Sequence, residues 1–429
     1  MLTVALGMAG SGIAAAVPAQ PNQEDVAQLL ADVLPPPVGD PFFDDTPPGL
    51  VDLEPGTVLD FRDITAVAGP LFVVPSRVNL LKYRTTGADS DSSDATYATA
   101  SLTVPAAPWL GPGKRPVYVN NLAINALGRG CSPSYLMTGQ TTHPEPPDKD
   151  FPPITATALA RGFAVLTTDH EGPNMNYGEP FVAGHAILDG IRAVRGQFPD
   201  EFDGSRFAMS GYSGGAIATH GAVKLIDSYA PELADDIVGA AIGGIPLDYA
   251  QLMTTMNGNL ASGLLAAAAL GVGRAHPEVL TLMSNDGRRL ATSDVRRLCS
   301  TALTAGGLGA LPLETFLYPQ ALDRPEVAAL FKRLRMPDIA AGTDLLVYNG
   351  ATDPWIPASG ARALATEQCS LGVSVEYFEG PAEHLVSETL HFQRVFSWVS
   401  DRLTAADPTP TASSCGPDGS VEVNRVSLS

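Results

Sequence analysis

The amino-acid sequence predicts an α/β fold, in which a mainly parallel β-sheet is flanked by helices and interrupted by a helical insertion. The first observation is that short apolar runs alternate with helical stretches such as "GHAILDGIRAVRG". Continuous apolar runs are typical of strands that are buried on both faces of a parallel sheet. The runs are "RPVYVNNLA", "FAVLTTD", "RFAMSG", "IVGAAIGGIP", "DLLVYNG" and "VSVEYFEG". The second observation is that this alternation stops over residues 247–337, where Ala- and Leu-rich helical patterns replace it.

The length and composition agree with such a fold. A chain of 429 residues has room for a large core and an insertion, and 45% hydrophobic with 17% charged residues describes a folded globular protein. With 26 basic and 46 acidic residues the formal net charge is −20, which argues against nucleic acid and anionic lipid as partners. A neutral ester or an oil droplet would not be repelled.

Residues 1–19 form an apolar stretch that ends on small residues, as a cleaved secretory signal peptide does. We therefore expect a signal peptide here and a secreted location, extracellular or at the cell envelope. The alternative is a disordered apolar leader. No later stretch supplies the ~18 uncharged apolar residues that span a bilayer, so no transmembrane segment is expected.

Residues 20–246 are expected to form the first part of the α/β core. Residues 20–60 are rich in Pro and Asp and are interpreted as an irregular arm lying across the surface. The segments "VNLLKYRTT" and "TYATASLTVPA" alternate in polarity on either side of the polar loop "GADSDSSD", which predicts two antiparallel strands. The first four apolar runs follow them.

Residues 247–337 are expected to form a helical cap, because the segment is far too long for a connecting loop. Its helical patterns are "ASGLLAAAALG", "ATSDVRRLCSTAL" and "RPEVAALFKRL". Residues 338–404 contain the last two apolar runs and complete the core. The Pro- and Ser-rich tail at 405–429 is expected to be disordered unless Cys415 ties it down.

The cysteines indicate disulfide bonds and not a metal site. None belongs to a C-x-x-C pair and no group of histidines accompanies them, so neither a metal nor a cofactor is expected. An even number together with an export signal favours disulfides, and four cysteines allow three pairings. They are Cys131, Cys299, Cys369 and Cys415.

The pentapeptide "GYSGG" (211–215) places Ser213 between the apolar run "RFAMS" and the helical pattern "GGAIATHGAVKLIDSYA". A serine in a sharp strand-to-helix turn needs Gly211 and Gly215, because Cβ atoms would collide there. The same turn puts the Gly214 N–H at a helix N-terminus, where it can stabilise an oxyanion. This context favours a nucleophile over a simple turn.

A nucleophilic serine needs a histidine base, and the base needs a carboxylate that holds its tautomer. In this architecture the chain order is serine, acid, histidine, with the last two on loops after strands. Asp353 follows "DLLVYNG" and His384 follows "VSVEYFEG". The sequence therefore predicts Ser213, Asp353 and His384 as the catalytic residues.

Rival candidates fit less well. Glu383 is adjacent to His384 in sequence, so their side chains diverge, and Glu379 ends a strand, where it is expected to face solvent or brace the turn. His391 lies in a predicted helix, where a packed or capping role is expected. The other histidines precede Asp353 and break the order: His143, His170, His185, His220 and His276.

The second oxyanion donor is expected in the loop after an earlier strand, here "VNNLAINALGRGCSPSY". Its polar candidates are Asn120, Asn121 and Asn125. Asparagines also satisfy the backbone of turns, and this role is preferred for Asn120 and Asn121. Gly214 and Asn125 are therefore the predicted oxyanion donors.

Eight motifs in order resemble the secretory lipases of the lipase A type, over about residues 40–415. They are "DPFF", "LLKYRTT", "CSPSY", "DHEG", "AILDGIRA", "GYSGG", "SYAPEL" and "AEHL". The resemblance implies an α/β-hydrolase fold with a helical cap, and hydrolysis of acylglycerols and other carboxylic esters. It also implies Ser213 as nucleophile, Asp353 as acid and His384 as base.

The resemblance further implies a departure at Asn125, which stands where lipase A carries an oxyanion-hole aspartate. An asparagine amide can still donate, but acyl preference or rate is expected to differ. The "DHEG" element (169–172) is implied to support the site structurally. The implied disulfides are Cys131–Cys299 and Cys369–Cys415.

The sequence thus predicts a secreted carboxylic-ester hydrolase with triacylglycerol lipase activity, which meets neutral lipid or another ester at a lipid–water interface. The alternatives are an acyltransferase and a serine peptidase with the same triad. The chain has no propeller repeats and no acidic motif for a peptide amine, and an apolar cap suits an acyl tail. A catalytically silent binding protein would not need the complete set of triad residues.

Overall fold

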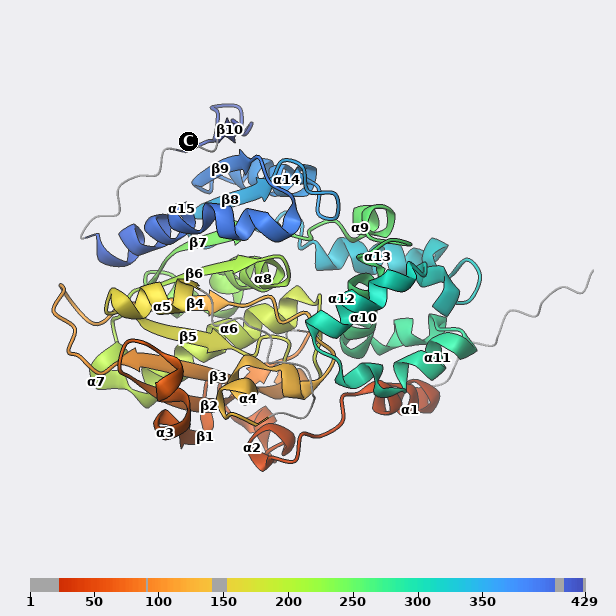
Figure 1. The fold of residues 1–429 in the computed structure, drawn as a ribbon, viewed down its shortest axis with the longest axis horizontal. Coiled ribbons are helices and arrows are strands. Elements are labelled where there is room, and N and C mark those ends of the chain that lie inside the picture. Colours follow the sequence, from red (N-terminus) through yellow and green to blue (C-terminus); the bar gives the residue numbers. More distant parts are fainter. Residues whose placement is uncertain (1–22, 90–91, 141–152, 406–412, 427–429) are drawn as a thin grey trace, which may run out of the picture.

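The computed structural model describes residues 23–89, 92–140, 153–405 and 413–426, and within them one sheet runs through the molecule (Figure 1). The strands of this sheet follow the spatial order β1-β2-β3-β5-β4-β6-β7-β8-β9-β10. Their bounds are β1 (Val58–Asp63), β2 (Ser76–Thr86), β3 (Ala95–Pro105), β4 (Val117–Asn121), β5 (Ala164–Thr168), β6 (Phe207–Tyr212), β7 (Ile237–Gly243), β8 (Leu345–Gly350), β9 (Val375–Gly380) and β10 (Asn424–Arg425).

The pairing of the strands confirms the predicted α/β class. β2 and β3 pair antiparallel with each other, and β1 and β5 join them antiparallel on either side. From β5 through β4 to β10 every neighbouring pair is parallel. The six apolar runs of the sequence are β4 to β9, and β4, β5, β6 and β8 are buried along their whole length.

Helices cover both faces of the sheet. One face packs against α6 (Pro180–Gln197), α8 (Gly214–Tyr229) and α14 (Ala358–Ser370), and the other against α5 (Pro153–Ala160) and α15 (His384–Thr404). Helices α6 and α8 approach each other closely at Gly184 and Gly221. A Cβ atom on Gly184 would collide with the backbone of Gly221. Four shorter helices complete the core: α2 (Pro41–Asp44), α3 (Thr65–Ala68), α4 (Pro133–Met137) and α7 (Pro199–Phe202).

The prediction of an irregular arm over residues 20–60 is wrong at both ends of that segment. Helix α1 (Gln23–Val33) precedes the proline run at 35–37, and β1 adds an edge strand to the sheet. Leu29 and Val33 of α1 are buried with Ala267 and Leu270 of the predicted cap. The Pro- and Asp-rich composition describes only the middle of the segment. The apolar face of α1 packs in a cluster with residues that are distant in sequence, from Leu127 to Leu303.

Residues 247–337, all of which the structure describes, form helices and no β-strand. The α-helices are α9 (Tyr249–Thr255), α10 (Ser262–Ala275), α11 (Asn285–Ala291), α12 (Ser300–Gly306) and α13 (Pro325–Leu334). They gather at one end of the sheet (right in Figure 1). The continuous helical pattern expected over residues 291–303 is broken, since a 3-10 turn at Asp294–Arg297 precedes Cys299 and α12.

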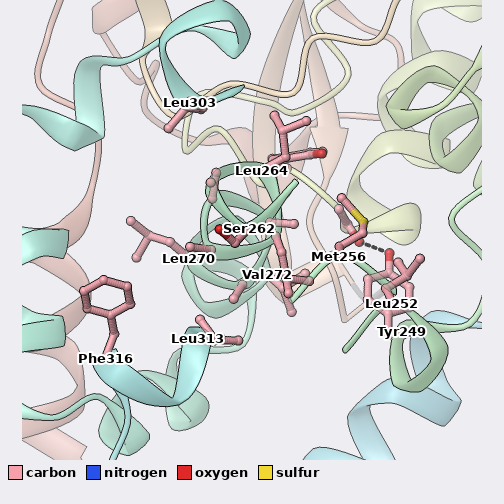
Figure 2. A pocket seen from close by; sticks show the side chains of 18 of the residues that line it. Tyr249, Leu252, Met256, Ser262, Leu264, Leu270, Val272, Leu303, Leu313 and Phe316 are labelled. Atoms are coloured by element: carbon pink, nitrogen blue, oxygen red, sulfur yellow. Dashed lines mark hydrogen bonds between the residues drawn. The ribbon is translucent and has the colours of Figure 1, made fainter. Parts of the chain in front are cut away.

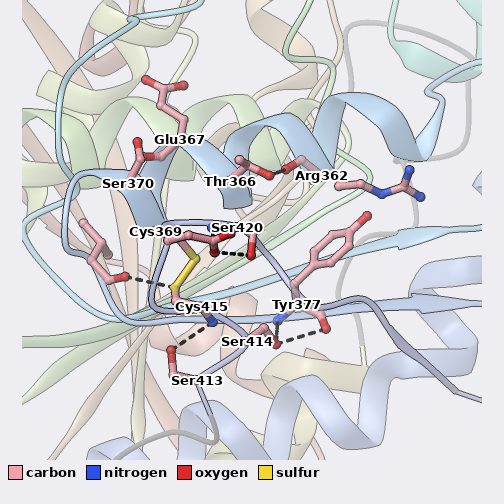
Figure 3. The surroundings of a disulfide bond; sticks show 12 residues. Arg362, Thr366, Glu367, Cys369, Ser370, Tyr377, Ser413, Ser414, Cys415 and Ser420 are labelled. Carbon is pink, nitrogen blue, oxygen red and sulfur yellow. Dashed lines mark hydrogen bonds between the residues drawn. A yellow bond between two sulfur atoms is a disulfide. The ribbon is translucent and has the colours of Figure 1, made fainter.

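Two disulfides join distant segments, with the pairing that the resemblance implied. Cys131, in the loop after β4, is bonded to Cys299 of the helical segment. Cys369 of α14 is bonded to Cys415 (Figure 3). The tail is also held by hydrogen bonds, since Ser414 N donates to Val375 O (2.7 Å) and Tyr377 N donates to Ser414 Oγ (3.0 Å). This agrees with the expectation that Cys415 fixes the tail.

The predicted signal peptide at residues 1–19 lies outside the described residues. Among the helices that are described, none is long and apolar enough to cross a membrane.

Candidate active site

Ser213 lies in the sharp turn between β6 and α8. Its backbone angles are φ 52° and ψ −118°, a conformation that a residue with a side chain adopts only under constraint. Gly211 and Gly215 permit this turn: a Cβ atom on Gly211 would collide with the backbone of Gly215, and one on Gly215 with the carbonyl oxygen of Asn121. The turn presents the Ser213 hydroxyl at the carboxyl end of the sheet.

The structure brings together the three residues that the sequence predicts as catalytic. Asp353 follows β8, and His384 is the first residue of α15, after β9. His384 Nδ1 lies 2.6 Å from Asp353 Oδ2, and His384 Nε2 lies 2.9 Å from Ser213 Oγ. A carboxylate at Nδ1 fixes the proton there, so Nε2 is free to accept the serine proton.

Asp353 and His384 are both held by further hydrogen bonds. Asp353 Oδ1 accepts the backbone N–H groups of Trp355 (3.0 Å) and Ile356 (2.8 Å), and its side chain is fully buried. The Tyr212 hydroxyl donates to the carbonyl oxygen of His384 (2.7 Å). These bonds fix the orientation of the imidazole before any substrate binds.

The rival carboxylates are committed elsewhere. Glu379 forms an ion pair with Arg362 and accepts a hydrogen bond from the Tyr377 hydroxyl (2.7 Å). The sequence suggested that Glu379 faces solvent or braces the turn. Instead, its side chain is buried and forms an ion pair. Glu383 caps α15 by accepting the Leu385 N–H (3.0 Å).

The rival histidines lie outside the row. His391 packs its ring edge-on against Phe378 and Tyr348. Four others contact backbone oxygens or a carboxylate: His170 with Leu122 O, His185 with Gly87 O, His220 with Arg335 O and His276 with Glu179. His143 lies outside the described residues.

Asn125 lies against the turn at Ser213, between β6 and α8. Its φ is 48°, and a Cβ atom on Gly214 would overlap its Oδ1. This oxygen is buried and has no hydrogen-bond partner among the described residues. The backbone N–H of Asn125 donates to Glu171, which leaves the side chain as the group that can serve an oxyanion.

Asn120 and Asn121 do not share this position. The Asn120 amide donates to Thr155 Oγ1 (3.1 Å) and the Asn121 amide to Thr219 Oγ1 (2.9 Å). Both side chains join β4 to the helices α5 and α8 that flank it. Their role is structural, but they bond to side chains and not to the turn backbone that the sequence suggested.

A cavity of about 380 Å³ opens beside Ser213 and His384. Figure 2 shows apolar side chains of the helical segment converging on it, among them Leu252, Met256 and Phe316. Nearly all of its lining is aliphatic or aromatic, whereas the reactive groups stand at its wall. Such a cavity can hold an extended apolar chain next to the serine.

Sequence reasoning missed Arg274, a single buried guanidinium in the Ala- and Leu-rich helix α10. It donates to backbone oxygens of three segments that are distant in sequence: Val33 O, Leu127 O, Asn174 O and Met175 O. Burial lowers its pKa to about 9. The sequence signal that could have identified Arg274 is its position as a lone arginine in an apolar helical pattern. A charge on a buried helix face must have hydrogen-bond partners.

No group of three or more His, Cys, Asp or Glu side chains within the described ranges could hold a metal ion.

Comparison with known proteins places this geometry in a family. The secretory lipase family model matches residues 153–411. Lipase A of Moesziomyces aphidis is 29% identical over 428 residues, covering 92% of this chain and 87% of that protein. A protein of Mycobacterium tuberculosis named as a probable inactive lipase is 29% identical over 397 residues, covering 90% and 86%.

A solved structure agrees with both. Candida antarctica lipase A in its closed state superposes with a TM-score of 0.76 at 27% identity, covering 88% of each chain. The fold is therefore an α/β-hydrolase fold. The match of the family model over more than half of the chain shows that this protein belongs to the secretory lipase family, and this kinship supports a lipase or esterase activity.

Proposed function

We propose that the chain is a secreted carboxylic-ester hydrolase that cleaves acylglycerols and other lipid esters through a Ser213–His384–Asp353 triad. The observation that carries the proposal is the hydrogen-bonded row of these three side chains at the wall of an apolar cavity. The row can activate an oxygen nucleophile, and the cavity suits an acyl chain.

Acylation begins when Ser213 Oγ attacks the ester carbonyl carbon and its proton passes to His384 Nε2. Asp353 stabilises the imidazolium that forms. The negative charge that develops on the carbonyl oxygen is stabilised by the Gly214 N–H and the Asn125 side chain. When the carbon–oxygen bond breaks, the leaving alcohol takes the proton from His384, and the acyl group stays on Ser213.

Deacylation repeats these steps with water. His384 removes a proton from water, the hydroxide attacks the acyl carbon, and the same donors stabilise the second oxyanion. Collapse returns the proton to Ser213 and releases the carboxylic acid. No metal or cofactor is required by these steps.

The cavity predicts a preference for long acyl chains. Each buried methylene contributes about 0.8 kcal/mol of transfer free energy, so eight methylenes in the cavity would contribute about 6 kcal/mol. This binding energy is available to a fatty acyl ester and not to an acetate ester. The experiment that tests the proposal is the rate on p-nitrophenyl esters from C2 to C16, measured beside a peptide anilide. A lipase cleaves the longer esters and not the anilide, whereas cleavage of the anilide alone would identify a peptidase.

Exposed leucines and a valine lie next to the triad and support a substrate at a lipid–water interface. Leu385, Val386 and Leu390, on the first turns of α15 after His384, are 66%, 45% and 41% exposed. Apolar side chains exposed beside a reactive centre are suited to contact an oil surface. The formal net charge of −20 does not oppose contact with neutral lipid.

The proposed organisation of the chain follows from this function. Residues 1–19 are a signal peptide, which agrees with the secretory family. The hydrolase core is formed by residues 20–246 and 338–404, and residues 247–337 are a cap that covers the serine and lines the acyl site. The tail at 405–429 is attached through its disulfide.

Ala269→Trp in the cap should suppress hydrolysis of C12–C16 esters at least tenfold more than that of acetate. Ala269 lines the cavity on α10, one helical turn from Leu265 and from Val272, which also line it. Ala267, on the same helix, is packed in the cluster with α1, so it is less suited to this test. The chain-length series measures the effect.

The matched control for this prediction is Ala329→Trp, an exposed alanine of α13 outside the cavity lining. It should leave the chain-length profile unchanged. An equal loss for acetate and palmitate with Ala269→Trp would mean that the cap is scaffold and not the acyl site.

Asn125→Ala should lower kcat and kcat/KM together by about a hundredfold, with KM nearly constant, because an oxyanion donor acts mainly in the transition state. Asn125→Asp restores the residue type of lipase A. An ionised carboxylate there would repel the oxyanion, so this variant should be active only where the carboxyl is protonated. Steady-state kinetics across pH measures both.

The control is Asn120→Ala, which removes the bond to Thr155 and should lower the melting temperature without a comparable fall in kcat. A near wild-type kcat for Asn125→Ala would remove Asn125 from the oxyanion site.

A further inference from the structure

The loop over residues 122–132, which carries Asn125, is fastened by three consecutive residues that follow β5. Asp169 Oδ1 accepts the backbone N–H of Ser134 (3.0 Å), just beyond the end of the loop. His170 Nε2 lies 2.7 Å from the carbonyl oxygen of Leu122, at its start. These two contacts hold the loop at its ends, and the third residue, Glu171, holds its middle.

Glu171 contacts the peptide bonds on both sides of Asn125. Its carboxyl group accepts the backbone N–H of Asn125 and, at 3.4 Å, that of Ala126. Because these peptide groups flank the Asn125 Cα, their orientation sets the direction of the Asn125 side chain. The Asn125 side chain lies against Gly214, and the Asn125 backbone has a positive φ, which asparagine tolerates.

The surroundings of Glu171 favour its neutral form at neutral pH. Glu171 is 3% exposed, and its second oxygen, Oε1, has no hydrogen-bond partner within the described ranges. Burial raises the pKa of Glu171 to about 8. The nearby Asp169 also raises this pKa, whereas the two N–H groups and Arg274 of α10 lower it. The other titratable groups near it are the Tyr177 hydroxyl and His170, whose own pKa burial lowers to about 4.

We propose that Glu171 is the positioning residue that aims the Asn125 amide at the oxyanion of the Ser213 reaction. A neutral carboxyl accepts both N–H groups without adding a negative charge next to the oxygen where negative charge develops. An ionised Glu171 would accept the same bonds but would raise the energy of the oxyanion. The proposal rests on the proposed esterase function.

Three variants test the role. Glu171→Gln keeps an acceptor oxygen for both N–H groups and cannot ionise, so its kcat at pH 7 should stay within about twofold of wild type. Glu171→Leu should lower kcat at least tenfold with little change in KM, because the loop loses its central acceptor. Wild-type kcat/KM should fall as pH rises through about 8, since the folded protein then loses the Glu171 proton, and Glu171→Gln should lack this decline.

The control is Asp189→Asn, which alters another buried carboxyl group, on α6. Asp189 is hydrogen-bonded to Arg192 of the same helix, to Thr85 of β2 and to Tyr229 of α8. It should lower the melting temperature and keep both the wild-type kcat and the alkaline decline. The rate of phosphonylation by a fluorophosphonate, per folded molecule, is measured for every variant.

The outcomes distinguish a failure of the positioning role of Glu171 from a failure of the proposed esterase function. If wild-type protein is phosphonylated and Glu171→Leu reacts at the same rate, or if Glu171→Gln keeps the alkaline decline, the positioning role is wrong and the esterase function stands. If wild-type protein neither hydrolyses esters nor reacts with the fluorophosphonate, the proposed function falls and the positioning role falls with it. The proposal is supported if Glu171→Leu is phosphonylated more slowly than wild type and if kcat/KM of Glu171→Gln shows no alkaline decline.

Discussion

Replacing Ser213 with alanine is expected to lower kcat for ester hydrolysis by roughly 10⁴- to 10⁶-fold and to abolish labelling by a fluorophosphonate. The expectation follows from the position of the Ser213 hydroxyl, which lies 2.9 Å from His384 Nε2 at the wall of the cavity. Alanine keeps the Cβ atom that the turn accommodates, so the melting temperature should change little. Activity and labelling are measured on the same purified variant.

The matched control is Ser210→Ala, three residues earlier in β6. The Ser210 hydroxyl is buried and lies 2.8 Å from the Tyr118 hydroxyl, so its loss affects packing and not the reactive row. This variant should retain labelling. A Ser213→Ala protein that is still labelled, on any other serine, would contradict the assignment of the nucleophile.

His384→Ala and Asp353→Asn should each remove most of the activity, and neither should add much to the loss caused by Ser213→Ala. Residues of a catalytic triad act as one unit, so the first substitution is expected to remove what the others contribute. Asp353→Asn is expected to cost roughly 10⁴-fold in kcat, because an amide no longer holds the Nδ1–H tautomer of the 2.6 Å contact. Single and double variants are compared by kcat on one ester.

Glu379→Gln is the control for the acid. It disturbs the ion pair with Arg362 and should lower stability without a comparable loss of kcat. An inactive Glu379→Gln beside an active Asp353→Asn would overturn the assignment.

The sequence was sufficient for features that depend on local pattern. The strands β4 to β9 were predictable because a strand covered on both faces must be apolar throughout. The order of Ser213, Asp353 and His384 was predictable because each stands directly after such a strand. The sharp turn at Ser213 was visible through its flanking glycines.

Features that depend on distant partners were not predictable. Helix α1 is stable because residues of the helical segment cover Leu29 and Val33, and no local pattern records that contact. Strand β10 is only two residues long and exists through pairing with β9. The bonds from Glu171 to the loop at Asn125 link residues 46 positions apart, and only the fold brings them together.

The family contains at least one relative that is named as a probable inactive lipase, so kinship alone does not establish turnover. The decisive property is whether Ser213 in this chain forms a covalent intermediate with an acyl group. The preorganised contacts of His384 and Asp353 give a physical reason to expect that it does.

The measurement that tests this most directly is mass spectrometry of the protein quenched in acid during turnover of p-nitrophenyl palmitate. The account predicts a palmitoyl adduct on the peptide that contains Ser213, formed in step with a burst of p-nitrophenol and lost as the substrate is exhausted. It also predicts no adduct in Ser213→Ala. Turnover of the ester by wild-type protein with the acyl group trapped on a different residue would contradict the account.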